Sequence, residues 1–342
     1  SDKKLWRNAF GTSKKECVEE LQTKVPMTSA ENRFQELNVS QISEVCKQLP
    51  TIKPASSVFF KDEAFHEVPS HDDIKPSFMM GTYLPGDKVK YHMSGDIIHF
   101  NLLKEKYPNP TGIVYDLGAN QGFYTYFLAA MGFDEVHALE IMPNNFGALQ
   151  HGILFNTKEV ADRVRLYSMG MSSTVKRMST SGQTYSGYLK AEKEGNLLSV
   201  SFDCFAYHVG LPEFIPFIKI DVEGFEIDVI KGTKQSLFQT RIGALLIEVG
   251  PNRWNRAGNS LEEGIEEMKA LSNLFEASFI LVRGDGDPTC SPNQIEVAKL
   301  EDKAPRILTA KMFKLGIHEF EPLLTNMKKK NADCNFWFTN PE

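Results

Sequence analysis

A glycine-rich segment near the middle of the sequence has the residue types needed to bind a nucleoside. It runs from Asp116 to Gly122, directly after an apolar stretch and directly before a helix-forming one. Glycines at the carboxyl end of a strand let a ligand approach the backbone, and the N-terminus of the next helix offers it free N–H groups. The alternative is a tight strand-to-helix turn without a ligand. The residues that we predict to contact a ligand here are Asp116, Gly118, Asn120, Gln121, Gly122 and Tyr124.

Glu140 strengthens this prediction because it ends the next apolar stretch, about 20 residues beyond the glycine loop. An acid at that point can accept hydrogen bonds from both hydroxyls of an adenosine ribose. Together with Met142, which follows closely, Glu140 completes the predicted binding set. The combination of loop and acid indicates a ligand that contains adenosine.

Two classes of adenosine ligand fit these residues, nicotinamide dinucleotides and S-adenosylmethionine. The spacing from Gly118 to Gly122 lacks the middle glycine of GxGxxG, which makes room for a pyrophosphate, and Asn120 stands where that contact would fall. The carboxylate of Asp116 would repel a diphosphate and suits a cationic amino-acid group better. S-adenosylmethionine is therefore favoured, and a nicotinamide-dependent oxidoreductase is the weaker alternative.

A dense acidic turn supplies candidates for proton transfer. Asp221 and Glu223 follow the apolar run from Phe217, at the edge where open α/β sheets bind their ligands, and Glu248 ends the next predicted strand. One of these carboxylates could act as a general base or orient an acceptor. Several acids at neighbouring strand ends could also hold a divalent cation, although no residue spacing specifies one. Glu226 and Asp228 lie in the first turn of a helix, where their charge favours a structural role.

The elements that must position these residues follow an alternating pattern of short apolar runs and longer periodic stretches. This pattern predicts a doubly wound, mostly parallel α/β sheet of seven strands. The predicted strands are Ile113–Leu117, Val136–Glu140, Val164–Ser168, Phe217–Asp221, Ala244–Val249, Ala277–Val282 and Asn335–Thr339. The predicted helices are Tyr124–Met131, Asn144–Phe155, Glu226–Phe238 and Leu261–Leu274.

Two segments fall outside this alternation. Residues 172–198 are rich in Ser, Thr, Gly and Tyr and predict a hairpin or an exposed excursion. Residues 1–93 are weakly periodic and predict a helical or irregular accessory segment, followed by the main domain over residues 94–342. The main domain is expected to begin with an amphipathic helix capped near Ser94 and ending before Pro108.

Composition narrows the possible partners. The 342 residues carry a formal net charge of −6, which offers no footprint for nucleic acid, and no apolar run has the length of a membrane helix. The five cysteines form no CxxC pair and no zinc-like spacing, so ordinary thiols are expected, with room for one or two disulfides. The chain begins at Ser1 and not at Met, so a leader or anchor could have been removed from it. We expect a location in the secretory-pathway lumen if such a segment was removed, and in the cytoplasm otherwise.

These motifs resemble those of the FkbM-type methyltransferase family. The resemblance rests on Val114 to Thr125, on Glu140 followed by Pro143, and on the long motif from Lys219 to Gly232. The family commonly has Asp after its third strand, where Met169 to Ser173 ends in serine here, and a His after the fifth strand that this chain lacks. The resemblance implies a Rossmann-like class I methyltransferase domain with S-adenosylmethionine as donor.

The expected activity is O-methylation of a hydroxyl on a sugar, a glycan or a related small molecule, as the family resemblance implies. In that reaction Asp116, Gly118, Asn120 and Gly122 would hold the methionine end of the donor, and Glu140 its ribose. Asp221, Glu223 or Glu248 would receive the proton. A non-catalytic module that binds S-adenosylmethionine without transferring its methyl group is the alternative from another class. The oligomeric state stays open.

Overall fold

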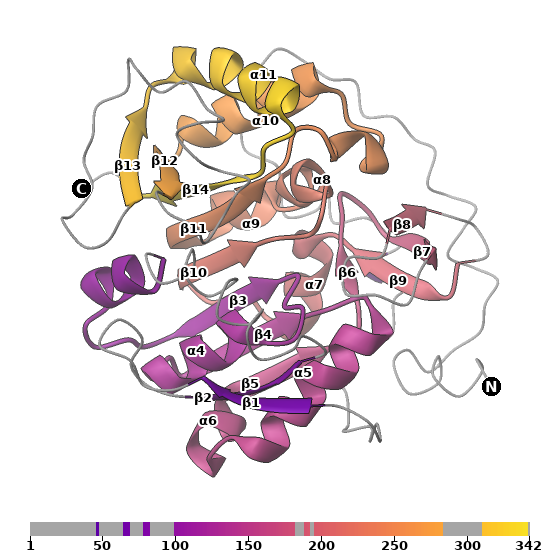
Figure 1. Cartoon of the computed structure of the whole chain (residues 1–342), viewed down its shortest axis with the longest axis vertical. Coiled ribbons are helices and arrows are strands. Elements are labelled where there is room, and N and C mark those ends of the chain that lie inside the picture. Colours follow the sequence, from indigo (N-terminus) through magenta and orange to yellow (C-terminus); the bar gives the residue numbers. More distant parts are fainter. Residues whose placement is uncertain are drawn as a thin grey trace.

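The computed structural model describes residues 46–47, 64–68, 78–82, 99–181, 188–191, 195–282 and 310–340. Within them the main sheet has eight strands in the order β13-β12-β14-β11-β10-β3-β4-β5 (Figure 1). Its neighbouring parallel strands are β5 (Val164–Tyr167), β4 (Glu135–Leu139), β3 (Ile113–Leu117), β10 (Phe214–Ile220) and β11 (Arg241–Val249). The chain moves outward from β3 to β5 and then returns to β10, which confirms the doubly wound α/β fold.

The other end of the sheet corrects the predicted number of strands. β14 (Cys334–Thr339) lies antiparallel between β11 and β12 (Glu276–Val282), and β13 (Ala310–Leu315) pairs antiparallel with β12. The described part of the sheet thus has one strand more than the seven predicted. In β13 the buried Phe313 and Leu315 flank the exposed Lys314, and this short alternation is typical of an edge strand.

Helices cover both faces of the main sheet. On one face lie the helix through residues 99–106, α4 (Phe123–Met131) and α5 (Pro143–Phe155). On the other face lie α7 (Phe202–Val209), α8 (Glu226–Lys231), α10 (Leu261–Ser272) and α11 (Phe320–Lys330). The predicted cap at Ser94 lies outside the described residues. The central strands are buried on both sides, which explains their continuous apolar sequences.

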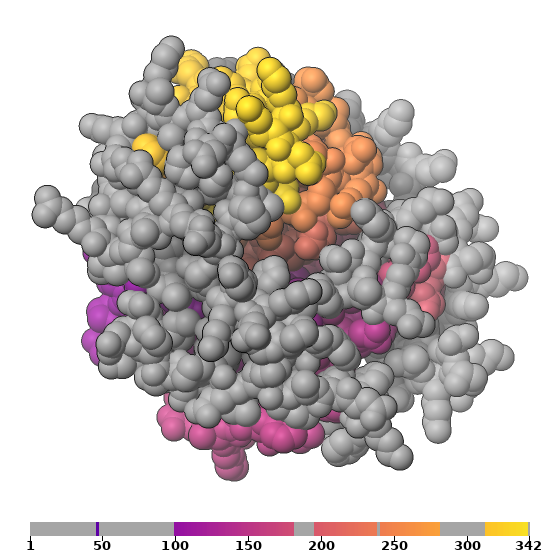
Figure 2. Space-filling view, viewed as in Figure 1, coloured from indigo at the N-terminus to yellow at the C-terminus, as the bar shows by residue number. Residues whose placement is uncertain are grey.

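Several shorter helices complete this architecture. α6 (Lys158–Arg163) precedes β5, and the 3₁₀ helices η3 (Trp254–Ala257) and η4 (Ile317–Glu319) precede α10 and α11. The helix predicted over Glu226–Phe238 is divided into α8 and α9 (Lys234–Gln239), because α8 ends at the C-cap Gly232. In the space-filling view α11 forms one end of the molecule and α6 the opposite end (Figure 2).

The predicted excursion between residues 172 and 198 is part of a small second sheet. Its strands are β6 (Gly170–Met171), β7 (Lys176–Ser181), β8 (Tyr188–Ala191) and β9 (Leu197–Val200), in the order β6-β9-β7-β8. Figure 1 shows this sheet beside the carboxyl ends of β3 and β10. The expected hairpin is present as β7 and β8, which pair antiparallel.

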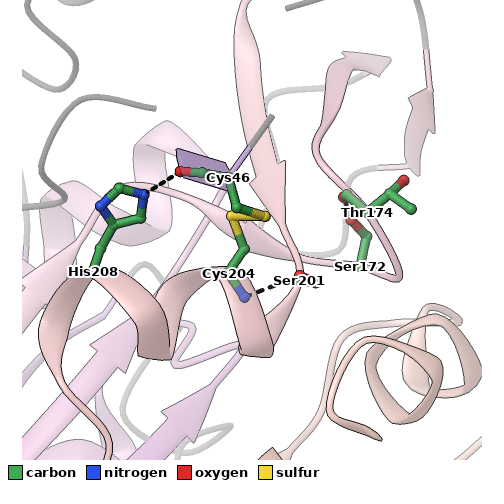
Figure 3. The surroundings of a disulfide bond; sticks show 6 residues. All are labelled: Cys46, Ser172, Thr174, Ser201, Cys204 and His208. Atoms are coloured by element: carbon green, nitrogen blue, oxygen red, sulfur yellow. Dashed lines mark hydrogen bonds between the residues drawn. A yellow bond between two sulfur atoms is a disulfide. The ribbon is translucent and has the colours of Figure 1, made fainter. Parts of the chain in front are cut away.

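The N-terminal segment contributes a feature that the sequence did not predict. β1 (Ala64–Val68) and β2 (Phe78–Thr82) pair antiparallel, where we expected helical or irregular structure, and β2 lies against α4 and α5. A disulfide joins Cys46 to Cys204 on α7, whose neighbour His208 bonds through Nε2 to the carbonyl of Cys46 at 2.7 Å (Figure 3). The expectation of ordinary thiols is therefore wrong for these two cysteines and for Cys334, which is also disulfide-bonded. The boundary at residue 93 stays a prediction.

None of the helices in the described part of the chain is both long enough and apolar enough to cross a membrane.

Candidate active site

The glycine loop between β3 and α4 needs a residue without a side chain at Gly118 and positive φ angles at Gly118 and Asn120. Gly118 has a φ of +85°, and a Cβ added to it would lie 1.7 Å from the carbonyl oxygen of Asp221. Asn120 also adopts a left-handed conformation, with a φ of 51°. Such backbone strain in a residue other than glycine is typical of functional loops. The loop thus brings the ends of β3 and β10 together.

Glu140 joins this loop to the end of β4. The backbone N–H of Asn120 donates to Oε2 of Glu140 at 2.8 Å, and the N–H of Met142 donates to Oε1 at 2.6 Å. Burial raises the pKa of Glu140 to about 7, although both N–H donors act to lower it. Each carboxylate oxygen keeps a second lone pair, so the group can still accept hydrogen bonds from a ligand.

A pocket opens at the carboxyl ends of β3, β4, β5 and β10. Of the residues predicted to bind the donor or act in catalysis, six line it: Gly118, Asn120, Glu140, Met142, Asp221 and Glu223. The small sheet supplies Gly170, Met171, Met178 and Ser199 to the same pocket. Such a position, outside the strand ends where the strand order reverses, is the general ligand site of open α/β sheets.

Four predicted donor residues lie outside this lining. Gln121 and Gly122 begin the turn into α4, and Gly122 is its N-cap. The Tyr124 hydroxyl is 2.6 Å from Nδ1 of His99. Asp116 is fully buried and accepts a hydrogen bond of 2.6 Å from Thr125 Oγ1. The structure therefore places Asp116 and Tyr124 behind the pocket wall, where they can support the loop.

A buried lysine connects Asp116 with the acidic turn. Lys219 Nζ lies 3.0 Å from Asp221 Oδ2, 3.9 Å from Asp116 Oδ1 and 4.6 Å from the centre of the Tyr124 ring. Burial opposes its charge, but the carboxylates of Asp221 and Asp116 raise the pKa of Lys219. Burial likewise acts to raise the pKa of Asp221, but the Lys219 ammonium and a hydrogen bond with Glu248 hold it below its usual value. Asp221 is consequently ionised at neutral pH.

The remaining predicted acids are held by arginines that follow β11. Arg253 pairs with Glu223, with Glu248 at 3.3 Å and with Asp333 at 3.2 Å. Arg256 donates to the Glu223 carbonyl at 3.1 Å and lies 3.9 Å from its carboxylate. Two arginines thus fix the position of Glu223.

Glu223 and Glu248 differ in access to the pocket. Glu223 has a φ of 53°, and its side chain lines the pocket with 42 % of its surface exposed. Partial burial and the nearby charge of Asp221 raise the pKa of Glu223, and Arg253 opposes this shift. Glu248 lies outside the lining, and burial followed by repulsion from Asp221 raises its pKa well above the usual value. Glu248 therefore lies between Asp221, to which it is hydrogen-bonded, and Arg253, outside the pocket lining.

The described residues contain no group of three or more His, Cys, Asp or Glu side chains arranged to hold a metal ion. The acids at the strand ends are instead paired with Lys219 and Arg253.

Sequence analysis missed three contributors to this site. Lys219 stands two residues before Asp221. Because side chains two residues apart on a strand lie on the same face, this spacing could have predicted that Lys219 lies beside Asp221. Arg253 and Met178 reach the site from segments distant in sequence, and no local pattern predicts that approach.

A comparison with protein families finds one match to this chain. Residues 116–276 match the family described as the methyltransferase FkbM domain, which confirms the resemblance found in the sequence. This range contains every residue assigned above to the donor or to catalysis. None of the curated proteins matches the chain.

Solved structures with similar chain traces include three methyltransferases. A putative O-methyltransferase from Klebsiella pneumoniae is 10 % identical with a TM-score of 0.38, and the match covers 76 % of this chain and 93 % of that one. The N-methyltransferase NodS from Bradyrhizobium japonicum is 10 % identical with a TM-score of 0.37, covering 75 % and 99 %. A precorrin-6y C5,15-methyltransferase from Geobacter metallireducens is 12 % identical with a TM-score of 0.33, covering 71 % and 86 %. Identities this low leave the acceptor open.

Proposed function

Because residues 116–276 match the methyltransferase FkbM domain, we propose that this protein methylates a hydroxyl of a sugar, a glycan or a related small molecule. The observation that carries the proposal is the pocket at the reversal of strand order, which combines the glycine loop, Glu140 and two carboxylates of the β10 turn. S-adenosylmethionine is the donor that the family and the fold imply.

The residues of the pocket fit that donor. Gly118 has no side chain to fill the space beside Asp221, and each carboxylate oxygen of Glu140 accepts one backbone N–H and keeps a second lone pair. Glu140 would hold the ribose hydroxyls, and the loop from Gly118 to Asn120 would hold the methionine end. When bound, S-adenosylmethionine supplies an electrophilic methyl group.

The two carboxylates of the turn, Asp221 and Glu223, have different roles in the proposed reaction. Asp221, kept ionised by Lys219, accepts a hydrogen bond from a second hydroxyl of the acceptor and thereby orients the acceptor, so that the proton of the reacting hydroxyl faces Glu223. Glu223, whose pKa is raised and whose side chain is partly exposed, receives the proton as the hydroxyl oxygen takes the methyl group. Environments that shift the pKa values of two neighbouring acids in opposite directions are typical of such a division of roles.

Binding and transfer are tested in two steps. Calorimetry with S-adenosylhomocysteine tests the donor pocket, and we expect saturable binding of one ligand per chain. Incubation with methyl-deuterated S-adenosylmethionine and a panel of glycans and small hydroxylated compounds, followed by mass spectrometry, tests transfer. Binding without transfer to any acceptor would favour the non-catalytic module, and a response to NAD without binding of S-adenosylhomocysteine would favour the oxidoreductase.

Variants of the two acids test their roles. We expect Glu223→Gln to lower kcat by about a hundredfold or more, because the variant cannot receive a proton, while S-adenosylhomocysteine still binds. Asp221→Asn should lower kcat and raise the KM of the acceptor, since the acceptor loses its orienting group. Glu262→Gln, on the exposed surface of α10, is the matched control. Activity of Glu223→Gln equal to that of the control would remove Glu223 from the mechanism.

The Cys46–Cys204 disulfide bears on the compartment. Disulfides of this kind form and persist in oxidising environments and are rare in the cytoplasm. Of the two locations left open by the sequence, we therefore propose the lumen of the secretory pathway. Recovery of the oxidised bond from the native host, detected by thiol alkylation and mass spectrometry, would support this location, and fully reduced Cys46 and Cys204 would contradict it.

A further inference from the structure

Arg253, in the loop after β11, contacts three carboxylates from three different parts of the chain. It pairs with Glu223 in the turn after β10, and it lies 3.3 Å from Glu248 Oε1 on β11 and 3.2 Å from Asp333 Oδ2 just before β14. A guanidinium group is planar and has five N–H donors, so one arginine can contact several carboxylates at once. Asp333 and Glu248 therefore share the positive charge that faces Glu223.

The backbone at the end of β11 leaves room for this arginine. A Cβ added to Gly250 would lie 2.5 Å from Asp333 Oδ1 and 2.7 Å from Arg253 Nε, so a side chain at this position would fit only if the ion pair shifted. The N–H of Arg253 donates to the Gly250 carbonyl at 2.9 Å and closes a turn. The Arg253 side chain is only 12 % exposed. Its own loop therefore holds Arg253 in place, in addition to the acids.

The turn that carries Glu223 packs against the backbone of the same arginine. Glu223 and Gly224 have φ angles of 53° and 104°, and a Cβ added to Gly224 would lie 2.6 Å from the Arg253 carbonyl oxygen. The N–H of Gly224 donates to Glu226 Oε1 at 2.7 Å, and Arg256 donates to the Glu223 carbonyl at 3.1 Å. Left-handed backbone outside glycine persists only where its surroundings determine it. These contacts therefore fix the position from which the Glu223 side chain reaches the pocket that it lines.

Glu248 connects this arginine to the other carboxylate of the turn. It is hydrogen-bonded to Asp221 and contacts Arg253. Asp221 is paired in turn with Lys219. The two pocket carboxylates are thus joined by a continuous chain of contacts through Arg253 and Glu248, which holds them relative to each other.

The way in which Arg253 is shared also determines how basic Glu223 is. Burial, followed by the charge of Asp221, raises the pKa of Glu223. Arg253 and Arg256 lower it, and Asp333 raises it again. An arginine paired with Glu223 alone would strongly favour the ionised carboxylate and leave it a weak base. The charged groups of the elements around this turn are Asp221 after β10, Glu226 on α8, Glu248 on β11, Arg253 and Arg256 beyond β11, and Asp333 before β14.

We propose that Arg253 is a positioning residue for methyl transfer, which directs the Glu223 carboxylate toward the acceptor without neutralising it. Asp333 and Glu248 are its partners in this role, because they hold the guanidinium group and compensate part of its charge. The inference rests on the proposed function, in which the hydroxyl proton moves to Glu223 as the acceptor oxygen takes the methyl group. Arg253 keeps all of its protons in this step.

The first test follows the protonation of Glu223 directly in the full chain. Glutamate that is isotopically labelled at its side-chain carboxyl carbon makes the titration visible by NMR, and Glu223→Gln identifies the signal. Removing the positive charge in Arg253→Gln should move the Glu223 titration to higher pH, and removing the negative charge in Asp333→Asn should move it to lower pH. Titrations that do not move in opposite directions would overturn the inference.

The second test measures methyl transfer to the acceptor identified with the panel. Arg253→Gln should lower kcat by about tenfold or more, because a misdirected base loses the advantage of proximity, while the Kd of S-adenosylhomocysteine stays within about twofold of the parent value. The acid limb of its kcat profile should lie at higher pH than that of the parent chain. Arg253→Lys keeps the charge but lacks the planar fork, so kcat should fall while the acid limb stays closer to that of the parent.

Arg163→Gln on α6 is the matched control. Arg163 is also partly buried, and it donates to the carbonyls of Gly132 and Phe133 at 2.6 and 2.8 Å, away from the pocket lining. This variant should lower the melting temperature without changing kcat or its pH profile. If Arg253→Gln does not fold, Arg253→Lys and Asp333→Asn provide the same comparison.

The outcomes separate this inference from the function on which it rests. Absence of methyl transfer by the parent chain would overturn the proposed function and the role of Arg253 together. Transfer by the parent chain, with equal kcat values in the Arg253 variants and in Arg163→Gln, would leave the proposed function intact and overturn only the role of Arg253.

Discussion

At the scale of single residues, the protonation of Glu140 should control the affinity for the donor. The ionised carboxylate accepts hydrogen bonds from the ribose hydroxyls, and protonation removes part of that capacity. Because burial raises the pKa of Glu140 to about 7 in the free protein, the ionised form is lost as the pH falls through that value. We expect the affinity for S-adenosylhomocysteine, measured by calorimetry, to fall roughly tenfold from about pH 8 to about pH 6. Glu140→Gln should bind weakly with a flat pH profile, and a flat profile in the parent chain would contradict this role.

The sequence predicted a site residue where a glycine or an acid directly follows an apolar strand. Gly118, Glu140 and Asp221 each follow an apolar strand, and the sheet brings all such ends to one edge. Asp116 has the same kind of position, yet its side chain is directed behind the pocket wall to Thr125. The direction of a side chain at a strand end depends on partners such as Lys219, which only the assembled sheet supplies.

At the scale of elements, one side chain of α7 holds the start of α9. The Asp203 carboxylate accepts hydrogen bonds from the N–H of Gln235 at 3.0 Å and from the N–H and hydroxyl of Ser236 at 2.8 and 2.7 Å. Asp203→Ala would leave these buried donors without their acceptor, which should lower the free energy of unfolding by about 1 to 3 kcal/mol. Chemical denaturation measures this loss. Asp203→Asn retains one acceptor oxygen and should lose less, so equal losses in both variants would contradict the capping role.

Local sequence predicted the elements that form regular units and missed those that depend on distant partners. The alternation of strands and helices located β3, β4, β5, β10 and β11, because most of their residues are apolar and buried. In β13 the exposed Lys314 lies between the buried Phe313 and Leu315, and the small sheet is assembled from four strands of two to six residues. Such strands acquire their partners only through tertiary packing.

At the scale of the whole molecule, the N-terminal segment is joined to both faces of the main domain. Cys46 is bonded to α7 on one face, and β2 lies against α4 and α5 on the other. The spacing of the cysteines in the sequence did not predict this disulfide, because pairing over a long sequence separation depends on the fold. The predicted accessory segment is therefore attached to the catalytic domain covalently as well as by packing.

The Cys46–Cys204 bond should contribute a large share of the stability of the molecule. It joins residues 158 positions apart, and closing so long a loop in the unfolded chain corresponds to roughly 4 to 5 kcal/mol of conformational entropy. Cys46→Ser, Cys204→Ser and the double variant should all lose a similar free energy of unfolding in denaturant titrations, because each removes the same cross-link. Variants are preferable to a reducing agent, since Cys334 is also disulfide-bonded and would be reduced as well. Single variants as stable as the parent chain would show that the cross-link does not constrain the unfolded state, and a double variant far less stable than either single one would assign the loss to packing of the two side chains.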